Sequence, residues 1–191
     1  MSTAAVPVNA RPVSGQGLAS YALLGLPLAL TALPVNILLP DFYARETGLA
    51  LTAIGLALLA TRLVDALADP LLGAWVDRQK SRGGYLRPIL IAAPPLAIGF
   101  ALLMHPPAVG AGAALAWLLA TLVACSLGYS LAIVAYQAWG AELAHDDAGR
   151  TRITAAREGA GLVGVLIGGA VPTALGMSPL VWIFLACLAL A

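Results

Sequence analysis

Three charged side chains occur inside one long apolar segment of the chain, where a charge is costly. Arg62, Asp65 and Asp69 are spaced i, i+3 and i+7, so a helix places all three on one face. If the helix begins near Leu49, Asp65 lies about 24 Å along it, past the middle of a membrane. A charge at that depth costs roughly 2.5 kcal/mol or more, so this stripe should face a polar cavity or the protein interior.

Two interpretations of the stripe remain open. Carboxylate oxygens suit a hard cation, and an aspartate in an apolar site can hold a proton, which favours an ion or proton site at Asp65 and Asp69. Arg62 would then set the charge of that site. Alternatively, the stripe is a closed structural network in which Arg62 neutralises one aspartate and Arg157 neutralises the other.

A second cluster follows at the end of the same segment. Gly73 would let two helices approach closely. Asp77, Arg78 and Arg82 come directly after it, where basic side chains can meet the carbonyls of a helix C-terminus. Such a cluster could latch helices together and release them in another conformational state, or it could only set the topology.

Polar side chains also occur on two later apolar segments. Tyr129, Ser130 and Gln137 lie on the fourth segment and could line a polar cavity, although aromatic residues there could also form an interfacial belt. Arg157 lies near the start of the fifth segment, where it could bind a ligand or extend to the membrane surface.

The fifth segment also carries small residues at regular spacing. Ala160, Gly164 and Gly168 recur every four residues, with Gly161 and Gly169 beside them. Such a face allows two helix backbones to pack closely. We therefore expect this segment to pack tightly against another helix.

The composition excludes a soluble protein and a disordered chain. Of the 191 residues, 61% are hydrophobic and only 10% are charged, against about 25% in soluble domains. The net charge of +1 provides no basic field for nucleic acid. Cys125 and Cys187 lie in apolar runs and form neither a disulfide framework nor a metal site. A polytopic α-helical membrane protein remains.

Charge-free stretches and turn residues predict six spans. A spanning helix needs about 20 apolar residues, and the sequence His105-Pro106-Pro107 with the glycines that follow divides one longer stretch in two. The last segment has roughly 20 Å of helix before the chain ends, less than the roughly 30 Å apolar core, so we expect a fragment or a truncated product. The predicted spans are 18–40, 49–76, 88–104, 113–139, 153–175 and an incomplete sixth from Pro179.

The distribution of basic residues predicts the orientation. Residues 1–17 are expected to form an uncleaved cytoplasmic tail, and residues 18–191 the membrane domain. Eight of the ten Lys and Arg residues fall in the tail and in alternate loops, which the positive-inside rule places in the cytoplasm. The chain should therefore be a multi-pass protein of the cytoplasmic membrane with both termini inside. These eight residues are Arg11, Arg78, Lys80, Arg82, Arg87, Arg150, Arg152 and Arg157.

This arrangement resembles the major facilitator superfamily, and within it the glycoside–pentoside–hexuronide:cation symporters, whose best-known member is the melibiose permease. The resemblance covers roughly residues 18–180, and its most specific piece is Arg-Leu-Val-Asp-Ala-Leu-Ala-Asp-Pro-Leu-Leu-Gly at 62–73. Gly73 to Arg82 resembles the loop motif of the superfamily, although Lys80 and Ser81 replace its usual glycine and basic residue.

The resemblance implies roles for individual residues. Asp65 and Asp69 would bind the coupling sodium or proton, with the hydroxyl of Ser130 close to it. Arg157 would lie near the sugar, with Tyr129 and Gln137 as further candidates for solute binding. The permease has sugar-binding aspartates at two places that align near Ala29 and Ile133, which cannot accept hydrogen bonds from sugar hydroxyls.

The resemblance therefore implies a cation-coupled secondary transporter of a sugar- or glycoside-type solute, with no cofactor besides the coupling ion. Its partners would be the solute, the cation and membrane lipid. The fold would be the N-terminal half of a twelve-helix transporter, a 3+3 inverted repeat with a truncated sixth helix, and the C-terminal six-helix half would be missing.

Other functions also remain open. The same broader family includes lysolipid transporters, so the solute could be amphipathic, and the isolated chain could be a non-transporting fragment. An enzyme is not expected. Asp65 and Asp69 are similar to the paired aspartates with which prenyltransferases bind magnesium diphosphate, but the necessary second acidic motif occurs only as Asp146-Asp147 in a predicted loop.

Overall fold

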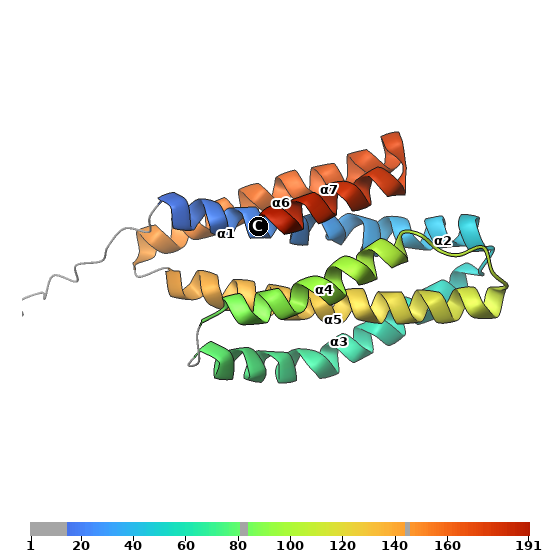
Figure 1. The fold of residues 1–191 in the computed structure, drawn as a ribbon, viewed down its shortest axis with the longest axis horizontal. Coiled ribbons are helices and arrows are strands. Elements are labelled where there is room, and N and C mark those ends of the chain that lie inside the picture. The colour runs from blue at the N-terminus through green and yellow to red at the C-terminus, as the bar shows by residue number, and fades with distance from the viewer. Residues whose placement is uncertain (1–14, 81–83, 144–145) are drawn as a thin grey trace, which may run out of the picture.

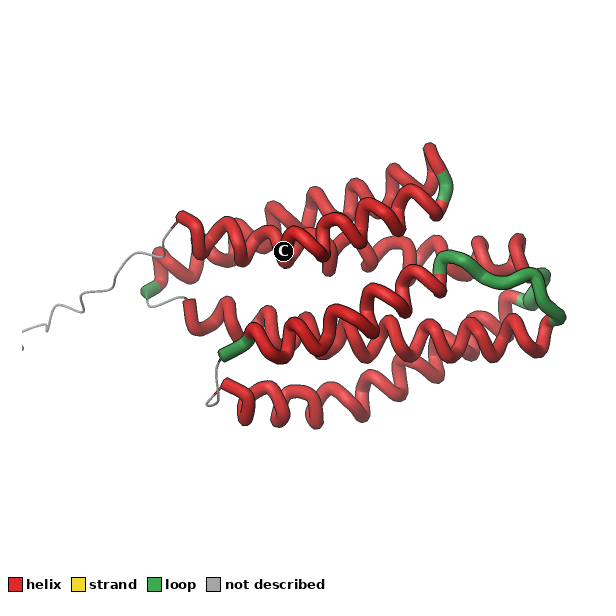
Figure 2. Tube along the Cα trace, in the orientation of Figure 1, coloured by secondary structure: helices red, strands yellow, loops and turns green. Residues whose placement is uncertain are grey.

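The computed structural model describes residues 15–80, 84–143 and 146–191, and the regular structure in these ranges is entirely helical (Figure 2). The expected all-α membrane fold is therefore confirmed. The elements are α1 (Gly15–Leu33), the π-helical turn η1 (Pro34–Leu38), α2 (Leu39–Thr47), α3 (Leu51–Lys80), α4 (Leu86–Leu103), α5 (Ala111–Leu143), α6 (Asp147–Leu175) and α7 (Met177–Leu190).

Five helices in the described ranges are long and apolar enough to cross a membrane, and α7 is a shorter apolar helix. The first span combines α1, η1 and α2. The predicted spans are found in the predicted order, but several helices are longer than predicted. The first span continues past residue 40 to Thr47, α3 past 76 to Lys80 and α5 past 139 to Leu143, and α6 begins before residue 153, at Asp147. Asp146 explains the early start of α6, because its carboxylate accepts a hydrogen bond from the Gly149 N–H at 2.7 Å and caps the helix.

The first span changes its hydrogen-bond pattern at a proline. Pro34 has no N–H to donate, and the chain passes through a π-helical turn in which the Leu39 N–H bonds to the Pro34 carbonyl. The Asn36 side chain donates to the Ala32 carbonyl at 2.7 Å, which satisfies one backbone acceptor at the irregularity. The side-chain oxygen of Asn36 remains available to a neighbouring helix.

The helices form two groups that lie side by side. Helices α1, α6 and α7 lie together in the upper part of Figure 1, and α3, α4 and α5 lie in the lower part. One end of the bundle, where α3 and α5 finish and α4 and α6 begin, is called the basic end below. The basic residues at this end of the described chain are Arg78, Lys80, Arg87, Arg150 and Arg152.

Glycines on α6 allow its backbone to lie directly against α1, as the spacing of the small residues predicted. A Cβ atom added at Gly164 would lie 2.6 Å from the Leu26 carbonyl oxygen, and one at Gly168 would lie 2.5 Å from that of Leu30. No larger residue fits at either position unless the helices separate. The predicted close packing of this segment is confirmed.

A second close pair of helices was not predicted. Gly99 on α4 lies against the backbone of Cys125, and Gly128 on α5 lies against the backbone of Leu96, where an added Cβ atom would come within 2.5 Å of a backbone nitrogen in both cases. By contrast, a Cβ atom at Gly73 would meet nothing within 4 Å among the described residues. The close helix contact expected at Gly73 is therefore wrong for the described part of the chain, because this part of α3 lies on an open face.

Side-chain contacts join the two groups at the end opposite the basic end. The Tyr43 hydroxyl on α2 donates to the Leu103 carbonyl of α4 at 2.9 Å, and the rings of Phe100 and Phe184 pack with centroids 4.6 Å apart. His105 is exposed at this end of the bundle. Its Nε2 lies 2.8 Å from the hydroxyl of Ser178 at the start of α7.

Candidate functional site

Asp65 is a buried carboxylate held between two helices. Its residue is 8% exposed, and Ser126 on α5 donates a hydrogen bond to Oδ1. The guanidinium of Arg62, one turn earlier on α3, lies 3.6 Å from Oδ2. Among the described residues, each carboxylate oxygen therefore has one partner, and the arginine is near the outer limit of ion-pair distance.

Arg62 connects this carboxylate to the first span. Its side chain also donates a hydrogen bond to Oδ1 of Asn36 in η1. Because Asn36 uses its nitrogen to bond the Ala32 carbonyl, its oxygen is oriented toward Arg62. The irregular turn of the first span, α3 and α5 thus meet at one polar cluster.

A cavity of about 220 Å³ lies beside this cluster. Two threonines in its wall, Thr31 and Thr61, donate their hydroxyl hydrogens to carbonyls of their own helices, at 2.8 and 2.9 Å. Their oxygens can still accept a hydrogen bond or coordinate a cation. The volume is enough for several water molecules, each of which occupies about 30 Å³ in the liquid. The full wall consists of Thr31, Ala32, Val35, Asn36, Leu58, Thr61, Arg62, Leu122, Cys125, Ser126 and Tyr129.

Asp69 lies one turn closer to the basic end and differs from Asp65 in its exposure and in its contacts. It is exposed, and within the described residues it makes no hydrogen bond or ion pair. Arg157, the cation that the closed-network interpretation assigned to the second aspartate, instead pairs with Glu158 at 2.8 Å. That network is therefore not formed, and the described side chains leave Asp69 uncompensated.

The serine that contacts Asp65 is Ser126, which was not predicted from the sequence. Ser130 is buried and, like Asp65 and Asp69, lines neither of the two cavities described here, whereas Ser126, one turn earlier, lines the first cavity and contacts Asp65 directly. A signal for Ser126 existed in the sequence, because it lies three residues before Tyr129 and so shares its helix face. Ser130 follows Tyr129 directly and points about 100° away from it.

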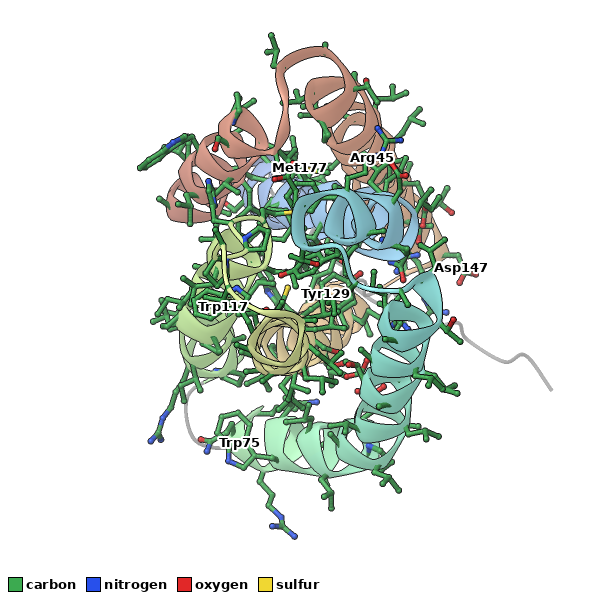
Figure 3. All side chains as sticks on the ribbon, turned by 90° about the vertical axis from the view of Figure 1, so that its right-hand side faces the viewer. Arg45, Trp75, Trp117, Tyr129, Asp147 and Met177 are labelled. Carbon is green, nitrogen blue, oxygen red and sulfur yellow. The ribbon has the colours of Figure 1, made fainter. Side chains whose placement is uncertain are left out.

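A second cavity, of about 280 Å³, lies between α1, α5 and α6. The three residues predicted to bind solute, Tyr129, Gln137 and Arg157, line it together. Tyr129 also lines the first cavity, so one side chain forms part of both walls, and Figure 3 shows it directed into the bundle. The remaining wall residues are Gly25, Leu28, Ala29, Ile133, Tyr136, Glu158 and Gly161.

Tyr136 provides an unsatisfied polar group in this wall. The residue is 1% exposed, and its hydroxyl has no hydrogen-bond partner in the described part of the chain. Its ring stacks on that of Tyr21 with centroids 4.2 Å apart. A Cβ atom at Gly25 would lie 2.6 Å from the hydroxyl, so the glycine makes room for it. A buried hydroxyl without a partner is costly, and a bound polar molecule would satisfy it.

The predicted latch is only partly visible. Asp77 and Arg78 lie exposed at the end of α3, and Arg82 falls outside the described residues. Among the described residues, Lys80 on α3 pairs with Glu142 on α5 and so joins two helices here, a contact that the sequence did not indicate. Burial raises the pKa of the neighbouring Tyr85, and the carboxylate of Glu142 raises it further, so this tyrosine stays neutral near physiological pH.

Comparison with known proteins shows similarity to membrane transporters of one family. The sequence model of the family described as MFS/sugar transport protein matches residues 20–187. The uncharacterized symporter YnaJ of Bacillus subtilis (strain 168) is 35% identical over 124 residues, which are 64% of this chain and 27% of the relative. The putative glycoside/cation symporter YagG of Escherichia coli (strain K12) is 34% identical over 100 residues, which are 52% of this chain and 22% of the relative.

A third relative covers more of the chain. The inner membrane symporter YicJ of Escherichia coli (strain K12) is 30% identical over 141 residues, which are 73% of this chain and 30% of the relative. The chain thus spans less than a third of the length of the curated relatives that it matches. No solved structure matches the chain significantly.

Proposed function

Because the chain belongs to the MFS/sugar transport protein family, we propose that it forms one half of a cation-coupled symporter for a glycoside-type solute. The observation that carries this proposal is the pair of cavities with Tyr129 in both walls. One cavity lies beside a buried carboxylate and the other is lined by hydrogen-bonding side chains. A symporter needs two such sites close enough to influence each other.

The coupling cation, sodium or a proton, binds beside the first cavity. Arg62, Asp65 and Asp69 together carry one net negative charge on one stripe of α3, and a bound cation neutralises it. The described residues contain no group of three His, Cys, Asp or Glu side chains that could hold a metal ion. A sodium ion would therefore need hydroxyl, carbonyl or water oxygens in addition, whereas a proton needs only one aspartate.

The solute binds in the second cavity. Gln137, Arg157 and the unpartnered hydroxyl of Tyr136 supply hydrogen bonds for sugar hydroxyls. Ala29 and Ile133 provide an apolar surface on the facing helices. This surface fits the less polar face of a sugar ring or the aglycone of a glycoside. It also fits the acyl chain of an amphipathic lipid, so a lysolipid is the second candidate solute.

The protein lies in the cytoplasmic membrane, and its basic end faces the cytoplasm. In this fold the solute site lies near the membrane midplane, between two six-helix halves. The second half would supply the opposite wall of the solute cavity. The exposed apolar side chains of α3 and α6, such as Leu67 and Leu162, would face that half or the lipid.

A counterflow experiment tests the proposal. The full-length transporter is reconstituted in proteoliposomes and loaded in turn with glycosides, free sugars and lysolipids, with and without sodium and at two external pH values. We expect exchange of a glycoside and its accumulation under a sodium or proton gradient. Exchange of lysolipid alone would establish the second candidate, and accumulation that does not respond to either gradient would refute cation coupling.

A further inference from the structure

The charged residues that line the second cavity, within the described chain, are Arg157 and Glu158, and their formal charges cancel. They are neighbours in sequence, and consecutive side chains on a helix normally diverge by about 100°. The Glu158 carboxylate nevertheless turns back toward the guanidinium. Its Oε1 accepts hydrogen bonds from Nη2 at 2.8 Å and from Nε at 3.2 Å.

This geometry leaves Arg157 able to bind a solute while its charge is compensated. A guanidinium has five N–H donors, and Glu158 engages two nitrogens on one edge only. The remaining donors can reach hydroxyl oxygens of a neutral solute. A carboxylate on the solute would have to displace Glu158 or lie beside its like charge, and both cost free energy.

We propose that Glu158 sets the charge selectivity of this cavity, so that the transporter prefers a neutral glycoside to the glycoside bearing a carboxylate. The inference rests on the function proposed above, because it assigns the second cavity to the solute. A second observation independently indicates a neutral polar ligand there. The buried Tyr136 hydroxyl has no partner, and a sugar hydroxyl can both accept from it and donate to it.

Glu158 contributes little to the stability of the fold, which makes the idea testable. The Glu158 side chain is 69% exposed and that of Arg157 is 38% exposed, and ion pairs this accessible add little to folding stability. Glu158→Gln removes the negative charge and keeps the size of the side chain. The cavity of this variant carries a net positive charge, which should attract a carboxylate.

The experiment uses two solutes that differ at one carbon. p-Nitrophenyl β-glucoside and p-nitrophenyl β-glucuronide carry CH₂OH and COO⁻ at the same position, and the corresponding galactoside and galacturonide form a second pair. Competition in counterflow with the full-length transporter gives the ratio of affinities within each pair. We expect the wild type to prefer the neutral member, and Glu158→Gln to shift the ratio toward the charged member by about tenfold.

Two further variants separate charge from shape. Arg157→Gln combined with Glu158→Gln makes the cavity neutral again and should return the ratio toward that of the wild type. Asp147→Asn removes a carboxylate from the same helix about 16 Å away and should leave the ratio unchanged.

Each other result has a definite meaning. The proposed role of Glu158 is overturned if the affinity ratio is unchanged in Glu158→Gln. It is also overturned if the double variant behaves as the single one does, or if Asp147→Asn shifts the ratio equally. A wild type that prefers the charged member overturns it as well. If the wild type exchanges neither member of either pair, the proposed glycoside transport fails first, and the selectivity of Glu158 fails with it.

Discussion

Ser126 on α5 donates a hydrogen bond to Asp65 on α3, and the two residues are 61 positions apart in the chain. The bond fixes the orientation of a buried carboxylate beside the first cavity. It also ties together two helices whose relative position defines that cavity. The proposed coupling site therefore depends on α5 as much as on α3, where its charges lie.

The first prediction concerns this hydrogen bond. Ser126→Ala should weaken the apparent affinity for the coupling ion by about tenfold or more, because a hydrogen bond to a charged group is worth roughly 1.5–3 kcal/mol. The measurement is the ion concentration that gives half-maximal solute uptake. Ser130→Ala is the matched control, since Ser130 lies one turn away and lines neither cavity. Equal effects of the two changes would show that the contact with Asp65 is not important for ion binding.

The second prediction concerns the two aspartates. Asp65→Asn and Asp69→Asn should each abolish ion-driven accumulation while solute exchange persists, because a neutral stripe no longer needs a cation to balance it. Uptake under an ion gradient and counterflow without a gradient are compared for both variants. Asp41→Asn, which alters an exposed ion pair with Arg45 far from the stripe, serves as the control. Normal ion-coupled accumulation in both variants would refute the cation site.

The third prediction concerns helix packing. Gly128→Ala should destabilise the protein by about 1–3 kcal/mol, because the new Cβ atom would lie 2.5 Å from the backbone nitrogen of Leu96. Gly73→Ala meets open space and should be neutral or stabilise by up to about 1 kcal/mol through helix propensity. Thermal unfolding of the purified protein in detergent, followed by circular dichroism, measures both. A loss of stability in Gly73→Ala comparable to that of Gly128→Ala would contradict the open environment of Gly73.

The fourth prediction concerns orientation. Single cysteines are introduced at Ala148, which is exposed at the basic end, and at Val109, which is exposed at the opposite end, in a variant that lacks Cys125 and Cys187. A membrane-impermeant thiol reagent added to intact cells should label the Val109→Cys variant only. Labelling of the Ala148→Cys variant from outside would reverse the predicted topology.

Much of the fold could be predicted from the sequence because membrane-spanning helices are long and apolar. The gaps between charges located the spans, and the glycine series of α6 predicted its close packing on α1. The ends of helices were less predictable. Lys80 and Asp147 are polar residues in helices that continue past their apolar parts, and hydropathy carries no information about such extensions.

The site was predictable only in part, for reasons that lie in side-chain geometry. Tyr129, Gln137 and Arg157 line one cavity, as a group of polar residues on apolar helices suggested. Ser126 was missed because a helical hydroxyl commonly bonds to its own backbone, as Thr61 does here, and sequence alone does not distinguish the two cases. Glu158 was missed because adjacent helical residues are not expected to face each other.

Tyr129 forms part of the wall of both cavities, and this has a thermodynamic consequence for the proposed symporter. Whatever factor the bound cation contributes to solute affinity, the bound solute must contribute the same factor to cation affinity. When two ligands contact one aromatic ring, the coupling between them needs no chain of intermediate residues across the bundle. The free energy that links the two binding events can reside in the position of a single side chain.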